Sequence, residues 1–120
     1  MKCFLLFFFL TTNCMGQVLT SKAEKLQKKN LQQYHAIETF AFKKWRSNDL
    51  KRVKEINDQV EAFLEVRRLV FRNFALDPAC LAAVNKHSAK SKRKNPFHNP
   101  TVDWKKVLFD LQSILANKRN

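Results

Sequence analysis

Two long segments, residues 19–45 and 49–74, carry hydrophobic side chains at the three- and four-residue spacing of an amphipathic helix. The stripe of the first segment consists of Leu19, Ala23, Leu26, Tyr34, Ile37, Ala41 and Trp45. The stripe of the second consists of Val53, Ile56, Val60, Phe63, Leu64, Phe71 and Phe74. Residues 46–48 interrupt the pattern with short polar side chains that can cap a following helix. The sequence therefore predicts a helical hairpin over residues 19–75, with its two helices antiparallel.

Two further helices are expected after the hairpin. Asp77 and Pro78 form a helix-start signal, which predicts a short helix over residues 77–87. The second hairpin helix has an additional apolar side at residues 66–70, where we expect the last helix to dock. That last helix is predicted over residues 101–117 from the stripe Trp104, Val107, Leu108, Leu111, Ile114 and Leu115.

Three polar residues, Asn30, Asn57 and Arg67, interrupt the hairpin stripes. Antiparallel pairing about residues 47–48 would bring Arg67 near Lys28 or Asn30, and Asn57 near Glu38. We interpret the three as boundary residues that fix the register of the two helices, in preference to a functional site.

The composition supports an all-α fold. The chain has 120 residues, 45% of them hydrophobic, but one glycine and three prolines, so few tight turns can form. Phosphate-binding loops that need several glycines are excluded. We expect a single domain over residues 17–120, a small antiparallel helical bundle that follows an N-terminal signal peptide.

The first 16 residues have the order of a secretory signal peptide. Lys2 supplies the positive charge, residues 3–10 are uniformly apolar, and a small residue, Gly16, precedes the expected cleavage point. Residues 3–10 are too few to span a bilayer as a permanent anchor. A secreted or periplasmic protein is therefore predicted, with no transmembrane helix in the mature chain. Lipidation of Cys14 is an alternative, although Asn13 fits it poorly.

Catalytic chemistry finds little support in the sequence. Cys80 remains the lone cysteine after signal removal, and its apolar neighbours predict a buried, inert thiol. The histidines His35, His87 and His98 lack metal-ligand spacing, and no serine lies in a nucleophile elbow. We therefore expect no cofactor, no metal and no enzymatic activity.

The charge of the chain favours an anionic partner. The net charge is +13, from 23 Lys and Arg against 10 Asp and Glu. The predicted loop at residues 88–100 follows the short helix and has no acidic residue. The candidate polyanion-binding residues are Lys86, Lys90, Lys92, Arg93 and Lys94. A solvated linker is the competing interpretation, and in a eukaryotic secretory pathway Arg93 would also fit a dibasic processing site.

The sequence thus predicts an exported, non-enzymatic helical binding or accessory protein. Its basic surface would contact acidic polysaccharide, lipid head groups or an acidic protein. Nucleic acid fits only if residues 1–16 are not a signal, and a membrane-active peptide only if an amphipathic helix leaves the bundle. The alternative is a structural subunit of an envelope or secretion assembly, with Phe42, Val102 and Phe109 at the surface for protein contacts.

Overall fold

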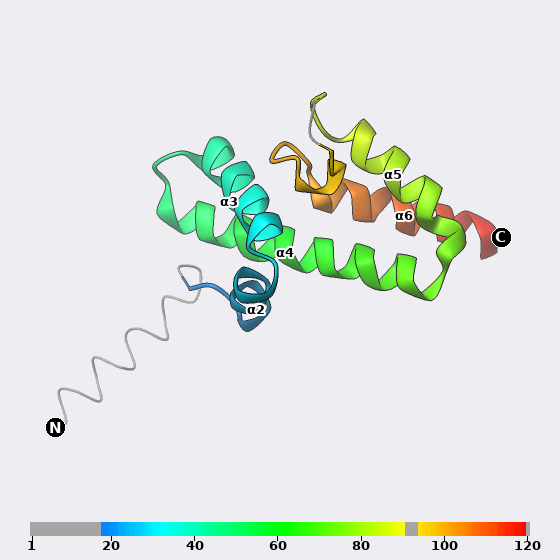
Figure 1. Ribbon diagram of the computed structural model, residues 1–120, viewed down its shortest axis with the longest axis horizontal. Coiled ribbons are helices and arrows are strands. Elements are labelled where there is room, and N and C mark those ends of the chain that lie inside the picture. The colour runs from blue at the N-terminus through cyan, green and yellow to red at the C-terminus, as the bar shows by residue number, and fades with distance from the viewer. Residues whose placement is uncertain (1–17, 91–93, 120) are drawn as a thin grey trace, which may run out of the picture.

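The computed structural model describes residues 18–90 and 94–119, and these residues form helices without strands (Figure 1). The predicted all-α fold is confirmed, whereas the predicted signal peptide at residues 1–16 lies outside the described residues. The α-helices are α2 (Ser21–Lys29), α3 (Leu31–Trp45), α4 (Asp49–Arg72), α5 (Asp77–Lys86) and α6 (Trp104–Arg119). Two short 3₁₀ helices, η2 (Phe74–Leu76) and η3 (Pro96–His98), precede α5 and α6.

The first predicted helix is interrupted at Asn30, so the prediction of one continuous helix is wrong. Asn30 has φ −144° and ψ 77°, outside the helical region. Its backbone N–H donates to the carbonyl of Leu26 at 2.8 Å, and its Oδ1 accepts from the N–H of Gln33 at 3.2 Å. Asn30 therefore ends α2 and caps α3 instead of fixing the register of an unbroken helix.

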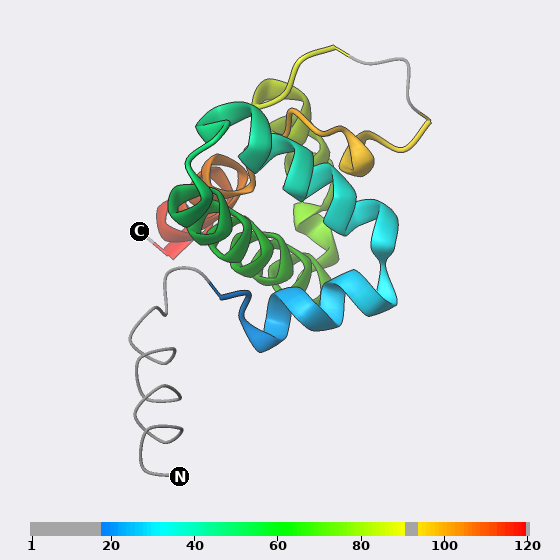
Figure 2. The ribbon, with the colours of Figure 1, turned by 90° about the vertical axis from the view of Figure 1, so that its left-hand side faces the viewer.

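The break at Asn30 lets α2 run across α4 instead of along it (Figures 1 and 2). Lys22 Nζ lies 3.2 Å from Glu61 Oε1 in the middle of α4. Asn57, also on α4, accepts from the N–H of Thr20 at 2.9 Å and donates to the carbonyl of Val18 at 3.0 Å. These contacts, which the sequence did not predict, fix the chain before α2 to the central part of α4.

The predicted break at residues 46–48 is a turn between α3 and α4. Asn48 caps α4, because its Oδ1 accepts a hydrogen bond from the N–H of Lys51 at 3.2 Å. The chain folds back at this turn, so that α3 packs against the first half of α4 (Figure 1).

Helices α5 and α6 complete the fold beside α4. Asp77 begins α5 but lies within its first turn, because Leu76 occupies the cap position without a side-chain cap bond. Helix α6 packs on α4 as expected, with the rings of Phe63 and Trp104 in an edge-to-face arrangement at 4.9 Å. Val102, which was expected at the surface, is buried at 2% exposure just before α6.

The core lies where α3, α5 and α6 meet α4. Its buried apolar side chains include Tyr34, Ile37, Val60, Phe63, Val66, Val84, Trp104, Val107 and Leu111. The predicted stripe of the second helix fails at its end, because Phe71 and Phe74 are 76% and 73% exposed. The physical reason is the course of α2, which crosses α4 near its middle and leaves this end uncovered.

Candidate functional site

The candidate polyanion-binding residues fall at the end of α5 and in the connection that follows. Lys92 and Arg93 lie outside the described residues. Lys86 ends α5, and its Nζ lies 3.7 Å from Asp110 Oδ2, so its charge faces a carboxylate of α6. Lys90 and Lys94 are exposed and have no ion-pair partner among the described residues. Of the described candidates, these two offer the most accessible charge.

The two ends of this connection are tied together by hydrogen bonds. The N–H of Ala89 donates to Thr101 Oγ1 at 2.8 Å, and the carbonyl of Ala89 accepts from Asn99 Nδ2 at 2.7 Å. The carbonyl of His87 accepts from the N–H of Asp103 at 3.1 Å. These bonds therefore hold the two ends of the predicted loop together, between the end of α5 and the start of α6.

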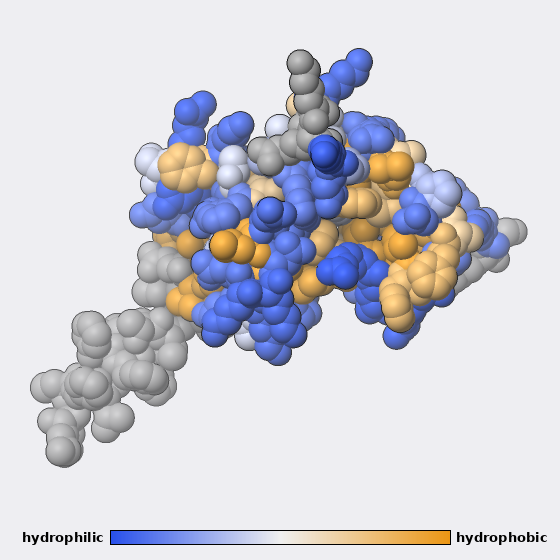
Figure 3. Space-filling view, in the orientation of Figure 1, coloured by the Kyte–Doolittle hydropathy of each residue, from blue (hydrophilic) through white to orange (hydrophobic). Residues whose placement is uncertain are grey.

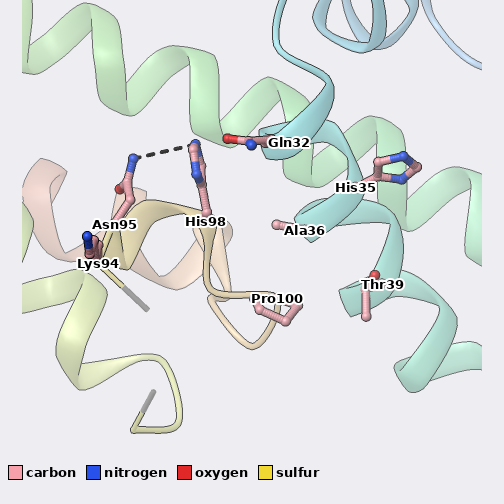
Figure 4. Close-up of a pocket in the computed structure, with 8 residues that line it drawn as sticks. All are labelled: Gln32, His35, Ala36, Thr39, Lys94, Asn95, His98 and Pro100. Carbon is pink, nitrogen blue, oxygen red and sulfur yellow. Dashed lines mark hydrogen bonds between the residues drawn. The ribbon is translucent and has the colours of Figure 1, made fainter. Parts of the chain in front are cut away.

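A cavity of about 490 Å³ lies between this connection and α3 (Figure 4). Helix α3 contributes Gln32, His35, Ala36 and Thr39, and the connection contributes Lys94, Asn95, His98 and Pro100. In Figure 4, Ala36 points toward the connection, while the ring of His35 turns away from it. His35 Nδ1 is 3.2 Å from Glu38 Oε1, three residues further along α3. We call this cavity the basic groove.

The lining of the basic groove suits an anion. Lys94 brings a positive charge, while Gln32 and Asn95 bring amide groups that can donate hydrogen bonds. The Nε2 of His98 lies 3.5 Å from Asn95 Nδ2, and the lining residues include no Asp or Glu. A carboxylate, sulfate or phosphate group could accept several hydrogen bonds here without facing a like charge.

The acidic residues of the chain do not offset this surface, because most are already paired. Seven of the ten lie within 4.0 Å of a Lys, Arg or His nitrogen: Glu38, Asp49, Glu55, Asp58, Glu61, Glu65 and Asp110. The positive excess therefore lies on the remaining lysines and arginines, which include Lys94 in the lining of the basic groove and Lys90 in the same connection.

A buried carboxylate, Glu55 of α4, was not found from the sequence. It is 4% exposed, and the ammonium groups of Lys44 and Lys105 lie 2.9 Å from its two oxygens. Trp45 Nε1 donates to it at 3.1 Å. Burial alone would raise the pKa of Glu55, but hydrogen bonds from Lys105, Lys44, Gln59 and Trp45 together lower it to about 2. A carboxylate held in this way joins α3, α4 and α6 and is a poor general base.

Gln59, one helical turn beyond Glu55, completes the polar cluster. Its Nε2 donates to Glu55 Oε2 at 3.1 Å and to Asp103 Oδ1 at 2.9 Å, while its Oε1 accepts from the N–H of Trp104 at 2.6 Å. Gln59 therefore satisfies the first backbone N–H of α6. Its position between Ile56 and Val60 of the apolar stripe is the sequence feature from which its burial could have been predicted.

The remaining reactive side chains are also engaged or buried. His87 Nε2 lies 2.8 Å from Asp110 Oδ2, and this hydrogen bond lowers the pKa of Asp110. Cys80 is buried as predicted, and desolvation together with Asp77 raises the pKa of its thiol. Within the described residues, no three His, Cys, Asp or Glu side chains converge in a way that would hold a metal ion.

The described part of the chain contains no helix with both the length and the apolar character needed to cross a membrane. Comparisons with protein-family models, with curated proteins and with solved structures find no match for this chain. The residues and their geometry are therefore the basis for a functional conclusion.

Proposed function

We propose that the protein is an exported, non-enzymatic binding protein whose basic groove contacts an anionic partner. The partner would be an acidic polysaccharide, lipid head groups or an acidic protein, held on a small antiparallel helical bundle. The observation that carries the proposal is the lining of the basic groove. Lys94, His98 and two amide side chains line one cavity that has no acidic residue in its lining. Lys90, exposed in the same connection, has no ion-pair partner among the described residues.

Two features support binding over catalysis. The pKa of Glu55 is about 2 because four side chains donate hydrogen bonds to its carboxylate. The carboxylate therefore stays ionised, and its oxygens already have hydrogen-bond partners. The thiol of Cys80 is buried with a raised pKa, which disfavours the nucleophilic thiolate. Neither group is available for the proton or acyl transfers that hydrolytic enzymes use.

A second candidate function is a structural subunit of an envelope or secretion assembly. It is favoured by Phe42 and Phe109, which are 56% and 68% exposed on α3 and α6. Val102 is buried and takes no part in such a contact. Mass measurement in solution separates the two functions, because a monomer supports the binding protein and a defined oligomer supports the subunit.

Salt-dependent binding to heparin and to anionic vesicles tests the basic groove. We expect affinity to fall as salt rises. The double variant Lys90→Gln/Lys94→Gln should bind about thirtyfold more weakly, since each of its two lost cations contributes about 1 kcal/mol near an anionic surface. The matched control is Lys25→Gln/Lys28→Gln, which removes equal charge from the exposed face of α2. Equal losses in the two variants would show that net charge, and not the basic groove, governs binding.

Export is tested by determining the N-terminus and the intact mass of the natural protein. We expect the chain to begin near Gln17, after removal of residues 1–16. A chain that retains Met1 would contradict export, and an added lipid mass on Cys14 would indicate a lipoprotein instead.

A further inference from the structure

A second cavity, of about 390 Å³, lies between the C-terminal half of α4, the start of α5 and the residues around η3. We call it the apolar cavity. Its apolar wall includes Phe63, Val66, Val70, Phe71, Phe74 and Phe97. Figure 3 shows hydrophobic side chains gathered on this face, over the C-terminal half of α4 and beside α5. The volume falls within the range of small-molecule sites, roughly 300–1,000 Å³.

The side-chain amide of Gln33 is a polar group in the lining of the apolar cavity. This side chain of α3 lines the cavity and is 1% exposed, yet its Nε2 has no hydrogen-bond partner. Among the described residues, it is the only buried side-chain nitrogen or oxygen in that state. An unsatisfied buried N–H is unfavourable by about 1–3 kcal/mol, so an acceptor oxygen of a ligand would gain a prepared donor.

Arg67 adds a positive charge to the same wall. Its guanidinium carbon lies 5.8 Å from the ring centroid of Phe63, and no acidic side chain in the described structure forms an ion pair with it. Asp77, in the first turn of α5, is the one acid that lines the cavity. Asp77 repels an anion on its own side, which places a negative group of a ligand toward Arg67 and Gln33.

Two exposed aromatic side chains complete the apolar cavity. Phe71 and Phe74 lie with ring centroids 6.1 Å apart at its border and remain 76% and 73% exposed. Aromatic side chains this exposed leave a large apolar area in water, which an apolar ligand would cover. The apolar cavity thus combines an exposed apolar wall with the hydrogen-bond donor of Gln33 and the positive charge of Arg67.

We propose that the apolar cavity binds a single-chain amphiphile with a carboxylate head, of the fatty-acid class. The acyl chain would lie along Val66, Val70 and Phe71, and the carboxylate would accept hydrogen bonds from Gln33 and Arg67. This site is distinct from the basic groove, although Asn95 and His98 border both cavities. It neither needs nor excludes the anionic partner proposed above.

Calorimetric titration of the purified protein with monomeric dodecanoate tests the site. We expect saturable binding with one ligand per chain, weakened about tenfold by Arg67→Gln. Arg72→Gln is the matched control, because Arg72 is exposed on the same helix but does not line the cavity. Dodecyltrimethylammonium has the same hydrocarbon chain and the opposite charge, and should bind at least about tenfold more weakly. Equal affinity for both amphiphiles, or equal effects of the two arginine variants, would overturn the proposal.

The variant Gln33→Leu separates a binding role from a packing role. We expect it to weaken dodecanoate binding about tenfold while the melting temperature of the free protein stays equal or rises. A lower melting temperature with unchanged dodecanoate affinity would overturn the role of Gln33.

Two further arms of the experiment separate this proposal from others. Dodecanoate binding should persist in Lys90→Gln/Lys94→Gln, so a failure of the basic groove would leave it intact.

Vesicle pelleting tests whether the two exposed phenylalanines insert into a bilayer instead. The proposed cavity ligand is wrong if monomeric dodecanoate does not bind, the protein pellets with phosphatidylcholine vesicles, and Phe71→Ser/Phe74→Ser abolishes this pelleting.

Discussion

The buried polar side chains at the first half of α4 have hydrogen-bond partners, whereas the one beside its second half has an amide nitrogen without a partner. In the first half, Glu55 and Gln59 are almost fully buried, and the protein itself supplies their partners: Lys44, Trp45, Asp103, Trp104 and Lys105. Beside the second half, Gln33 Nε2 is buried without a partner, and Phe71 and Phe74 are exposed. The first half behaves as a scaffold, and the second half has the properties of a surface that remains to be covered.

The difference has a local cause at Asn30. Had α2 continued in line with α3, it would have followed α4 toward Phe71 and Phe74. The cap at Asn30 instead turns α2 toward Asn57 and Glu61, the contacts that hold it across the middle of α4. One polar residue in an apolar stripe therefore decides which part of α4 is covered. A sequence stripe shows which side chains can be buried, but the course of the neighbouring helix decides which of them are.

The largest effect is expected in the scaffold half, from Gln59→Leu. Leucine is similar in size to glutamine but cannot accept from the Trp104 N–H. It also lacks the two hydrogen bonds that Gln59 donates to Glu55 and Asp103. We expect a loss of about 3 kcal/mol in the free energy of unfolding, measured by urea denaturation. Gln32→Leu is the control, because Gln32 is exposed on α3 and should change stability by less than about 0.5 kcal/mol. Similar values for the two variants would contradict a scaffold role for Gln59.

A smaller effect is expected from acid acting on Glu55. Its pKa is lowered from 4.5 to about 2 in the folded protein, so the ionised carboxylate stabilises the fold fully above about pH 4.5. That contribution is lost as the pH falls toward 2, because the unfolded state binds the proton first. Glu55→Gln removes this dependence, so the stability gap between the parent and the variant should shrink between pH 5 and pH 2.5. A gap that stays constant over this range would show that Glu55 is not held ionised.

The smallest effect is expected at the uncovered end of α4. Phe71→Ser and Phe74→Ser should each change the free energy of unfolding by less than about 0.5 kcal/mol, because both rings are mostly exposed. Phe63→Ala removes the buried phenylalanine of α4, should lose about 3 kcal/mol or more, and serves as the contrast. If Phe71→Ser were as damaging as Phe63→Ala, the second half of α4 would be scaffold as well.

Much of the fold could be predicted from local pattern. The turn at residues 46–48 follows from capping residues, the start of α5 from the proline at its first turn, and the packing of α6 on α4 from helical periodicity. The break at Asn30 could not be placed with the same information. The hydrophobic stripe resumes on both sides of it, and an asparagine in a helix can either fix the register or form a cap.

The candidate sites were harder to predict than the fold. The basic residues Lys90 and Lys94 are visible in the sequence, but the facing wall of the basic groove comes from α3, more than fifty residues earlier. The apolar cavity depends in the same way on Gln33, whose partners and neighbours are set by the tertiary arrangement. Periodicity identifies Gln33 as a helical residue but does not say that its amide is buried without a partner.

The most direct test of the account is the unfolding free energy of Gln33→Leu measured beside that of Gln59→Leu under identical conditions. Both variants replace a buried glutamine by leucine, so they differ in whether the protein satisfies the amide. We predict a loss of about 3 kcal/mol for Gln59→Leu and no loss, or a gain of up to about 1 kcal/mol, for Gln33→Leu. Equal losses in the two variants would contradict the distinction between a satisfied scaffold and an open binding surface.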